Sequence, residues 1–217
     1  MNATAVIPVK GLRDVKRRLS SRLSSAERAG LVMRLVGREL DVLGAVERIE
    51  RVIVVTSDER VKTLAEMKHA DVALQPDNGV NAAIDAGIAR AYEAGAQIVV
   101  ALHGDLPFIV KSDVEALLDA TGAGVFVIAP DRKRIGTNAI VVRRADPVPL
   151  RFGFDSYARH LDAATSAGTL VREVRRSGLG FDLDTPGDLI QYRRRRKLRD
   201  TDRQIRQGNR IAGNAAR

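Results

Sequence analysis

The alternation of short β-branched apolar runs with longer helical segments is the feature that most constrains the fold of this sequence. Residues 52–56 (Val-Ile-Val-Val-Thr) form a continuous apolar run, which is typical of a strand buried on both faces of a sheet. Residues 25–43 place apolar side chains near helical spacing, which predicts an amphipathic helix. Strands and helices that alternate in this way indicate an α/β fold, with a parallel or mixed sheet and crossover helices.

The rest of the chain continues this pattern as far as residue 190. Gly95 would end the helix that begins at residue 81. Ser112 or Asp113 would cap a later helix, and Thr185 would cap the last one, with Pro186 at its first position. No linker divides residues 1–190, so we expect a single Rossmann-like domain with helices on both faces of a mainly parallel sheet. The further expected strands are 5–9, 71–74, 98–102, 125–129, 138–142 and 180–183, and the further helices are 58–67, 81–94, 111–121, 154–167 and 169–177.

The composition excludes several kinds of chemistry. The 217 residues include no cysteine, which excludes disulfides, thiolate metal sites and cysteine nucleophiles. A chain of this length buries enough surface to fold without such cross-links. No apolar run approaches the roughly 18 residues of a membrane span, and the first residues lack a secretory signal pattern. We therefore expect a cytoplasmic protein that does not bind membranes.

The net charge of +9 is concentrated at the C-terminus. Residues 191–217 contain ten Lys and Arg against two Asp, so they carry +8 and leave residues 1–190 nearly neutral. We predict a folded domain over residues 1–190 and a basic C-terminal extension over residues 191–217. Arginine-rich extensions can bind nucleic acid, but no aromatic residue follows Tyr192 to stack on bases. We favour a solvated extension and do not expect nucleic acid as a partner.

The segment after the strand at 98–102 contains the clearest candidate site residue. Asp105 follows that strand, and Gly104 allows the backbone to turn. Ligands in open α/β sheets bind outside the carboxyl ends of strands, which is where Asp105 would lie. The alternative is that Asp105 only caps the next segment, and the residues by themselves leave both interpretations open.

A pair of carboxylates, Asp182 and Asp184, lies just before Thr185. Residues two apart in a strand project from the same face, so the two carboxylates would repel unless a cation or donors neutralise them. With Asp105 at an adjacent strand end they would form an all-oxygen cluster suited to Mg²⁺. Asp184 has a structural alternative, as a cap of the helix that Pro186 opens.

A basic segment follows the first predicted strand. Lys10 beside Gly11 can present backbone N–H groups and a charge to an anionic ligand, and Arg18 can hold a phosphate bidentately. The pattern of a P-loop is absent. Arg13 and Arg17 are better explained as a solvated basic face. A basic loop and an acidic cluster at one sheet edge favour phosphate chemistry with a metal.

Two later loops carry small polar residues that could complete an anion site. Thr137 follows Gly136 at the start of a strand, and Ser156 follows Gly153 near the start of a helix, where backbone N–H groups favour anions. As an alternative, Ser156 or its neighbour Asp155 is simply a helix cap. The three histidines, His69, His103 and His160, show no spacing typical of metal ligands. We expect them to be surface or core residues, with His103 close to the site.

Several short motifs occur in one order between residues 7 and 186. They are 7–10 (Ile-Pro-Val-Lys) with Lys16, Arg18 and Leu19, 54–56 with Asp58, Gly79 with 81–82, 104–107 (Gly-Asp-Leu-Pro), 130–131, 136–139 (Gly-Thr-Asn-Ala), 152–153 with Ser156 and His160, and 182–186 (Asp-Leu-Asp-Thr-Pro). Together they resemble the 2-phospholactate guanylyltransferase family of deazaflavin-coenzyme biosynthesis. The fold that this resemblance implies is that of nucleotide-diphospho-sugar transferases of the glycosyltransferase-A type.

The resemblance implies roles for many of these residues. Residues 1–190 would be a guanylyltransferase domain in which Asp105, Asp182 and Asp184 hold two Mg²⁺ ions. Lys10 and Asp105 would be catalytic. The residues implied in GTP binding are Pro8, Val9, Lys10, Lys16, Arg18, Thr56, Asn81 and Gly104, and those implied in acceptor binding are Thr137, Gly153 and Ser156.

The implied reaction is attack by a phosphate oxygen of the acceptor on the α-phosphorus of GTP, with release of pyrophosphate. Such chemistry needs cations that hold two polyanions in line rather than a protein nucleophile. The implied acceptors are the three-carbon phospho-acids 2-phospholactate, phosphoenolpyruvate and 3-phosphoglycerate. Basic residues 132–134 crowd the approach to Gly136, and an extra donor there favours 3-phosphoglycerate. The resemblance also implies a homodimer and a downstream transferase that accepts the labile product.

Two other functions stay open on the sequence. One is a nucleotidyltransferase with another base or a sugar-phosphate acceptor, which would share the fold. The other is a nucleic-acid-binding protein that acts through its basic extension.

Overall fold

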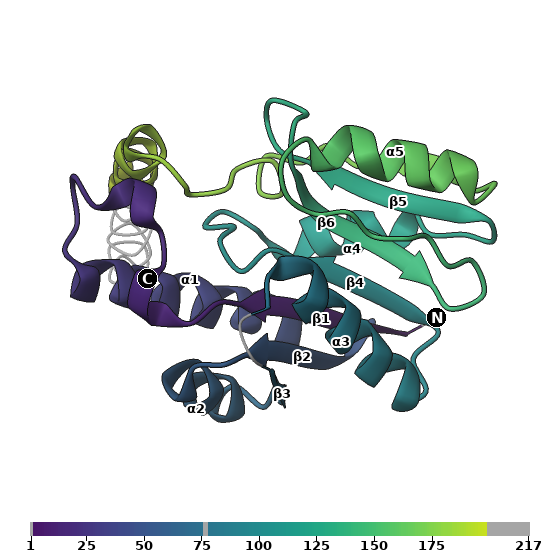
Figure 1. Ribbon diagram of the computed structural model, residues 1–217, viewed down its shortest axis with the longest axis horizontal. Coiled ribbons are helices and arrows are strands. Elements are labelled where there is room, and N and C mark those ends of the chain that lie inside the picture. Colours follow the sequence, from purple (N-terminus) through teal and green to yellow (C-terminus); the bar gives the residue numbers. More distant parts are fainter. Residues whose placement is uncertain (1, 76–77, 199–217) are drawn as a thin grey trace, which may run out of the picture.

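Within the described residues, 2–75 and 78–198, seven strands form one mixed sheet at the centre of the computed structural model (Figure 1). The strand order is β3-β2-β1-β4-β6-β5-β7. Strand β6 is antiparallel to its neighbours β4 and β5, and the other pairs are parallel. The mainly parallel sheet expected from the sequence is confirmed. Its strands are β1 (Ala3–Val9), β2 (Ile49–Thr56), β3 (Asp71–Leu74), β4 (Ile98–Leu102), β5 (Val125–Pro130), β6 (Thr137–Arg143) and β7 (Leu170–Glu173).

Helices cover both faces of this sheet, as expected. One face packs against α1 (Ser25–Gly44), α2 (Glu59–Met67) and α4 (Lys111–Asp119), and the other against α3 (Val80–Glu93) and α5 (Ser156–Ser166). Two short 3-10 turns, η1 (Leu12–Asp14) and η2 (Arg17–Leu19), follow β1, and residues 186–198 form a last helix. Among the described residues, no helix is both long and apolar enough to cross a membrane.

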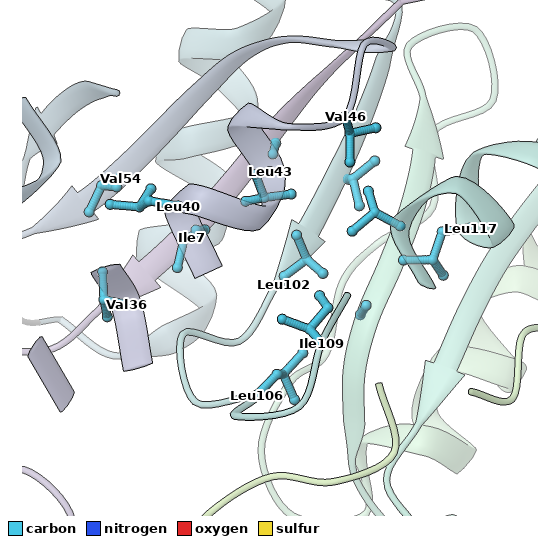
Figure 2. Close-up of a cluster of buried hydrophobic side chains, with 14 of the residues drawn as sticks. Ile7, Val36, Leu40, Leu43, Val46, Val54, Leu102, Leu106, Ile109 and Leu117 are labelled. Atoms are coloured by element: carbon cyan, nitrogen blue, oxygen red, sulfur yellow. The ribbon is translucent and has the colours of Figure 1, made fainter. Parts of the chain in front are cut away.

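The alternation of side chains along β1 explains why this strand is apolar over most of its length. Ile7 faces the layer of α1 and α2, whereas Val6 faces the layer of α3. Figure 2 shows the first layer, in which Ile7 and Val54 of the sheet lie beside Val36 and Leu40 of α1. Burial of a side chain of this kind stabilises the fold by about 1.5–3 kcal/mol. A strand covered on both faces rarely contains an unpaired polar side chain, because burying one is unfavourable. The continuous apolar run of β1 is therefore a sign of a central strand.

Helix α3 approaches β1 closely at Gly87. A Cβ atom at Gly87 would lie 2.4 Å from Cγ1 of Val6, so a side chain here would push the helix away from the sheet. The N-cap of α3 is Gly79, whose φ of 95° lies in the region that favours glycine. The tight packing at Gly87 therefore helps to hold the first turn of α3 at the carboxyl edge of the sheet.

A separate apolar cluster ties the C-terminal segment to the same edge. Leu183 and Leu189 pack with Leu31 and Leu35 of α1 and with Phe108, which follows β4. In Figure 1 the yellow-green helix lies on the same side of the molecule as the start of α1, with which it packs. This packing joins parts of the chain that are far apart in the sequence.

The last helix begins where the sequence predicts it. Thr185 is its N-cap, because the Thr185 hydroxyl oxygen accepts the N–H of Asp188 at 3.3 Å and donates to the Asp188 carboxylate at 2.7 Å. The helix runs across the domain boundary predicted at residue 190. The division into residues 1–190 and 191–217 stays a prediction, and residues 199–217 lie outside the described part of the chain.

The helix predicted over residues 169–177 is wrong. Residues Leu170–Glu173 form β7, which pairs in parallel with β5 and places Leu170 opposite Val125. The apolar residues Leu170, Val171 and Val174 fit helical and strand spacing about equally well. The edge of β5 decides between them, because pairing there satisfies the backbone N–H and C=O groups of both segments.

The strand predicted over residues 180–183 is also wrong. Residues 174–184 contain no strand, and the N–H of Leu183 donates to the backbone oxygen of Asp105 at 3.2 Å. Phe181 and Leu183, the apolar residues of the predicted strand, are buried in the separate cluster of Phe108 rather than on the sheet. Burial away from the sheet produced the strand-like pattern.

Two predicted helix ends have different outcomes. Gly95, with a φ of 92°, follows the end of α3 as predicted. The predicted cap of α4 at Ser112 or Asp113 is wrong, because Val110 is the N-cap. Asp113 lies three residues into the helix and accepts the Val110 N–H at 3.1 Å, so it satisfies the helix end from inside.

Candidate active site

A cleft of about 740 Å³ opens along the carboxyl edge of the sheet, where β1, β2 and β4 end and β6 begins. Ligands in open α/β sheets bind at this edge, and the sequence analysis placed its candidate residues there. All of the predicted site residues except Asn81 line the cleft: Pro8, Val9, Lys10, Lys16, Arg18, Thr56, Gly104, Asp105, Thr137, Gly153, Ser156, Asp182 and Asp184.

The three predicted metal-binding carboxylates come together because the C-terminal segment docks on the loop after β4. The N–H of Leu183 donates to the backbone oxygen of Asp105, which places Asp182 and Asp184 on either side of that contact. The Leu183 side chain is fully buried in the apolar cluster of Phe108. One backbone hydrogen bond and one apolar anchor thus bring together residues from two distant motifs.

An ammonium group lies between two of these carboxylates. Nζ of Lys16 is 2.5 Å from Oδ2 of Asp105 and 2.5 Å from Oδ1 of Asp184. Burial tends to lower the pKa of Lys16, but Asp105 and Asp184 outweigh it and hold the pKa above its usual value. Arg18 lies further out, with Nη1 4.0 Å from Oδ2 of Asp184. The family resemblance implied a role for Lys16 in GTP binding, and nothing in the sequence indicated this pairing.

The carboxylates carry more negative charge than Lys16 neutralises. Burial and the charges of Asp105 and Asp184 raise the pKa of Asp182 from 3.8 to about 6. Burial would also raise the pKa of Asp105, but Lys16 and His103 hold it below its usual value. Oδ1 of Asp105 is buried and has no hydrogen-bond partner among the described residues. A cation bound here would relieve both the repulsion and the unpaired oxygen.

Mg²⁺ fits this set of donors. It prefers hard oxygen ligands and binds proteins through a few carboxylates together with substrate phosphates. Within residues 2–75 and 78–198, no three His, Cys, Asp or Glu side chains are arranged ready to hold a metal ion. The Lys16 ammonium group stands among the carboxylates instead, so a metal would take over a place that a cation already holds.

A further buried carboxyl group belongs to Glu39 of α1. Its side chain is fully buried, and neither carboxyl oxygen has a hydrogen-bond partner among the described residues. Burial and the charge of Asp105 raise the pKa of Glu39 well above its usual value, which favours the neutral acid. Glu39 was not among the residues predicted from the sequence. A signal was available, because Glu39 interrupts the apolar stripe of this helix beside Val36 and Leu40.

The basic loop after β1 is held in place from the end of β2. The N–H of Leu12 donates to Oδ2 of Asp58 at 2.9 Å, and Oδ1 of Asp58 accepts the N–H of Arg60 at the start of α2. Lys10, at the beginning of this loop, is exposed and lines the cleft. The loop therefore presents a cation where β1 and β2 end, as an anion-binding loop requires.

The end of β3 contributes Gln75, which the sequence analysis missed. The N–H of Gln75 donates to the Thr56 oxygen at 3.1 Å, and Nε2 donates to the Ala82 oxygen at 3.3 Å. Gln75 lines the cleft, and its Oε1 is buried without a hydrogen-bond partner among the described residues. Thr56 is itself nearly buried, and its hydroxyl accepts the N–H of Asp58 at 3.2 Å. The available signal was a polar residue directly after a strand.

Asn81, predicted to lie near the nucleoside, makes hydrogen bonds to the protein backbone. Its Oδ1 accepts the N–H of Phe152 at 2.8 Å, and its Nδ2 donates to the Phe152 oxygen at 3.1 Å. Asn81 is not among the described residues that line the cleft. The two hydrogen bonds fix the loop before α5 to the start of α3. Asn81 therefore helps to position the loop that lines the cleft, without lining the cleft itself.

The predicted acceptor residues lie together at the starts of β6 and α5. The N–H of Thr137 donates to Oγ of Ser156 at 3.0 Å, and Oγ1 of Thr137 is 3.0 Å from Nδ1 of the buried His160. Gly153 has a φ of 116°, which favours glycine. The N-cap of α5 is Asp155, but its side chain makes no capping hydrogen bond. Of the two caps considered from the sequence, Asp155 thus occupies the N-cap position, and Ser156 is hydrogen-bonded to Thr137.

Arg132 faces away from the acceptor side of the cleft. Its Nη2 lies 2.6 Å from Oδ1 of Asp188, and its Nη1 donates to Gln191 at 3.0 Å. The guanidinium carbon lies 4.2 Å from the centre of the Phe181 ring. Arg132 thus fastens the loop after β5 to the C-terminal segment.

Arg134 also has partners outside the cleft. Its Nη2 donates to the Tyr157 hydroxyl at 2.5 Å and to Oε2 of Glu173 at 2.9 Å. None of residues 132–134 is among the described residues that line the cleft. The extra donor expected near Gly136 is therefore not supplied by Arg132 or Arg134, and the expected preference for 3-phosphoglycerate loses its basis.

The sheet order and the cleft at the carboxyl edge define the class of this protein as an open, mainly parallel α/β fold with its candidate site where such folds bind ligands. A Desulfovibrio desulfuricans protein assigned to the nucleotide-diphospho-sugar transferases is similar to it with a TM-score of 0.75 and 21% identity, over 95% of this chain and 98% of that one. A Mycobacterium tuberculosis protein in complex with manganese is similar with a TM-score of 0.58 and 16% identity, over 88% and 98%. These likenesses confirm the predicted fold.

Sequence comparison narrows the class to one family. The model described as "Guanylyl transferase CofC like" matches residues 3–193, so the chain belongs to this family and is a guanylyltransferase. Its relatives include the phosphoenolpyruvate guanylyltransferase of Rubrobacter xylanophilus, 41% identical over 90% of this chain and 100% of the relative. The 3-phospho-D-glycerate guanylyltransferase of Phenylobacterium zucineum is 36% identical over 88% and 90%. The 2-phospho-L-lactate guanylyltransferase of Methanothermobacter thermautotrophicus is 31% identical over 87% and 83%.

Proposed function

We propose that this guanylyltransferase transfers GMP from GTP to the phosphate group of a three-carbon phospho-acid, releasing pyrophosphate, as a step in deazaflavin-coenzyme biosynthesis. The observation that carries the proposal is the cleft, which gathers a carboxylate cluster, a basic loop and two hydroxyl groups at one edge of the sheet. Such a set of groups suits a reaction between two polyanions. The names of the relatives support the same reaction.

The cofactor in this proposal is Mg²⁺, with Asp105, Asp182 and Asp184 as its ligands. Its support is the unpaired buried oxygen of Asp105, the raised pKa of Asp182 and the Lys16 ammonium group among the carboxylates. When bound, Mg²⁺ would offset charge on the GTP phosphates and on the departing pyrophosphate. The manganese in the structural neighbour is a divalent metal bound by a protein of this fold.

The nucleotide side of the cleft would hold GTP by charge and by one specific acceptor. Lys10 and Arg18 would contact the phosphates, with Pro8, Val9 and Gly104 forming the wall beside them. Gln75 would accept a hydrogen bond from the N1–H or amino group of guanine, because its Oε1 has no partner among the described residues. Adenine has no N–H at N1, so an acceptor here would favour GTP over ATP. An unsatisfied buried acceptor costs about 1–3 kcal/mol, which bound guanine would recover.

The acceptor side would bind the phospho-acid through Thr137, Gly153 and Ser156. Phosphoenolpyruvate is the acceptor that we propose first. The relative named for this substrate is 41% identical, and the one named for 3-phosphoglycerate is 36% identical. Arg132 and Arg134 are engaged elsewhere, so they give no reason to prefer the substrate with a free hydroxyl.

The residues of the chain would orient the reacting groups rather than activate them. A phosphate oxygen of the acceptor is already ionised at neutral pH, so the attack on the α-phosphorus needs no general base. Lys10 would offset the charge that develops on pyrophosphate, and Asp105 would be one of the residues that hold the metal. The rate would then depend on how well the two polyanions are held in line.

The proposal is tested by pyrophosphate release with GTP and Mg²⁺, run separately with phosphoenolpyruvate, 3-phosphoglycerate and 2-phospholactate. The product is labile, so a downstream transferase should be present to capture it. Asp14→Asn is the matched control for Asp105→Asn, because Asp14 lines the cleft and is 66% exposed at its rim.

We expect release with phosphoenolpyruvate above the other two acceptors, and none with Asp105→Asn. Preference for another of the three would change only the acceptor. No release with any of them, or release that depends on CTP, UTP or ATP instead of GTP, would contradict the proposed reaction.

A further inference from the structure

We infer that His160 is a positioning residue of the acceptor site, which holds the Thr137 hydroxyl so that its proton points to the bound phospho-acid. The identity of that ligand rests on the function proposed above, whereas the position of His160 in the hydrogen-bond network is independent of it. His160 lies in α5, and its side chain is fully buried behind the cleft residues Thr137 and Gly153.

Both ring nitrogens of His160 have defined partners. Nε2 accepts the backbone N–H of Arg151 at 2.9 Å, and Nδ1 lies 3.0 Å from Oγ1 of Thr137. The ring is also packed edge-on against Phe152, with the ring centres 4.7 Å apart, and lies near Phe126. The packing and the two hydrogen bonds leave the imidazole one orientation.

The partner at Nε2 determines which nitrogen carries the proton. A backbone N–H can only donate, so Nε2 must be unprotonated to accept from Arg151. Burial, followed by the charge of Arg159, lowers the pKa of His160 from 6.5 to about 4, so the ring is neutral at pH 7. A neutral imidazole has one N–H, which is therefore on Nδ1. It donates to Oγ1 of Thr137, and the ring also has a hydrogen bond with the backbone of Ser156.

This direction of donation decides what Thr137 offers to a ligand. Its hydroxyl oxygen accepts from His160, so the hydroxyl proton is free to point elsewhere. Ser156 is arranged in the same way, because its Oγ accepts the N–H of Thr137. Both residues line the cleft. Two hydroxyl groups that are held as donors match the phosphate and carboxylate oxygens of a phospho-acid, which only accept.

The hydrogen bond made by Nε2 of His160 holds the loop that contains Gly153. By accepting from Arg151, the ring holds the backbone one residue before Phe152, which Asn81 clamps at both its N–H and its oxygen. The contributions of the hydrogen bonds at Nδ1 and Nε2 can be separated by substitution. His160→Asn keeps an amide donor near the place of Nδ1, and His160→Gln keeps an amide oxygen near the place of Nε2.

Steady-state kinetics of the two variants test the inference. In His160→Gln we expect the KM for the phospho-acid to rise about 10-fold while the KM for GTP stays within twofold. In His160→Asn we expect the KM for the phospho-acid to stay within about threefold of wild type. A structural role alone would instead lower kcat or raise both KM values in each variant.

Thr137→Val is the matched background for these measurements, because it removes the hydroxyl and keeps the shape of the side chain. In this background His160→Gln should not raise the KM for the phospho-acid further. A rise of the same size with and without the Thr137 hydroxyl would overturn the inference. Calorimetric titration with phosphoenolpyruvate should give the same ratios for Kd, and it does not depend on turnover.

The tautomer of His160 supplies a test that needs no substrate. The chain has three histidines, so the nitrogen NMR signals of His160 can be assigned by their loss in His160→Asn. We expect protonated Nδ1 and unprotonated Nε2 at pH 7. The opposite tautomer or a charged ring would overturn the inference even if the enzyme turns over. Failure of all three acceptors with the expected tautomer present would instead contradict the proposed function.

Discussion

Nζ of Lys16 lies 2.5 Å from Oδ1 of Asp184, although the two residues are 168 positions apart in the sequence. The same nitrogen lies 2.5 Å from Oδ2 of Asp105, so one ammonium group joins two carboxylates of the proposed metal site. The Lys16 side chain is 9% exposed, which limits screening by water. A lysine therefore acts as the cation of this cluster in the absence of metal.

Removal of this cation should destabilise the metal-free protein and strengthen metal binding. In Lys16→Met we expect a loss on the order of 2 kcal/mol, because Asp105 and Asp184 lose their partner while Asp184 stays partly solvated. For a chain of this length that corresponds to a fall in Tm of roughly 4–8 °C with chelator present. Mn²⁺ should bind at least about 10-fold tighter than to wild type, because no ammonium group opposes it.

Lys10→Met is the control for this experiment, because Lys10 lines the same cleft. Among the described residues, Asp105 and Asp184 form their ion pairs with Lys16 and Arg18. Lys10→Met should leave the Tm in chelator nearly unchanged. Equal or weaker Mn²⁺ binding by Lys16→Met would show that the ammonium group does not compete with the metal.

Each of the three carboxylates should be needed for turnover. Asp105→Asn, Asp182→Asn and Asp184→Asn should each reduce the rate of pyrophosphate release by at least about 100-fold, because each removes a charged oxygen ligand. The substitutions open no cavity, so far-ultraviolet circular dichroism should be unchanged. Full activity in any two of the variants would contradict the three-carboxylate site.

Gln75 should contribute to the choice of guanine. In Gln75→Ala we expect the KM for GTP to rise about 10- to 100-fold, equivalent to about 1.5–3 kcal/mol, while the weak use of ATP changes little. Gln75→Glu keeps an acceptor at the same place and should recover much of the loss. An equal effect on GTP and ATP would instead assign Gln75 to the shape of the cleft.

Acid should destabilise the protein through His160. Its pKa is 6.5 when exposed and about 4 in the fold, so the unfolded chain binds more protons between these values. The free energy of unfolding should therefore fall as the pH falls from 6.5 to 4, by at most about 3 kcal/mol. Urea unfolding of wild type and His160→Asn in chelator measures this, and the variant should lack this part of the pH dependence.

His69→Asn is the control for the pH experiment. His69 is exposed after α2 and has a φ of 58°, a conformation that asparagine also adopts readily. This variant should keep the pH dependence of wild type. If His160→Asn kept it as well, the acid sensitivity would have to come from other groups.

Arg132 should matter for stability and not for the choice of acceptor. Arg132→Ala removes the pairing with Asp188 and the contact with Phe181, which should cost roughly 1–2 kcal/mol because the side chain is 40% exposed. Lys133→Ala, at an exposed neighbouring position, is the control. The ratio of kcat/KM among the three acceptors should be the same in both variants. A selective loss with 3-phosphoglycerate would restore the interpretation made from the sequence.

Most of the helices and strands follow from local patterns in the sequence. The apolar run predicts β2, and the helical spacing of apolar side chains predicts α1. The residues 169–177 and 180–183 are the exceptions. Val171 is only partly buried, in the strand that pairs with β5, whereas Phe181 and Leu183 are buried with Phe108. No local period distinguishes these two surroundings.

The candidate site was predictable to the extent that its residues follow strand ends. Asp105 and Thr56 lie at one edge because parallel strands end together there. The roles of Lys16, Asn81 and Glu39 were not predictable in this way. Lys16 and Asn81 have partners from distant segments of the chain, and Glu39 has no hydrogen-bond partner among the described residues. Both situations depend on how distant segments pack together.

The sequence by itself determined the α/β class, the order of its first helices and strands and the edge at which the site lies. Those properties depend on residues that are neighbours along the chain, and short-range periodicity records them. Only the tertiary structure decided that Lys16 faces Asp105 and Asp184, that Arg132 turns to Asp188 and that Oγ1 of Thr137 lies 3.0 Å from Nδ1 of His160. Each of these contacts joins residues far apart in the sequence, and its strength depends on burial and direction that exist only once the segments have packed together.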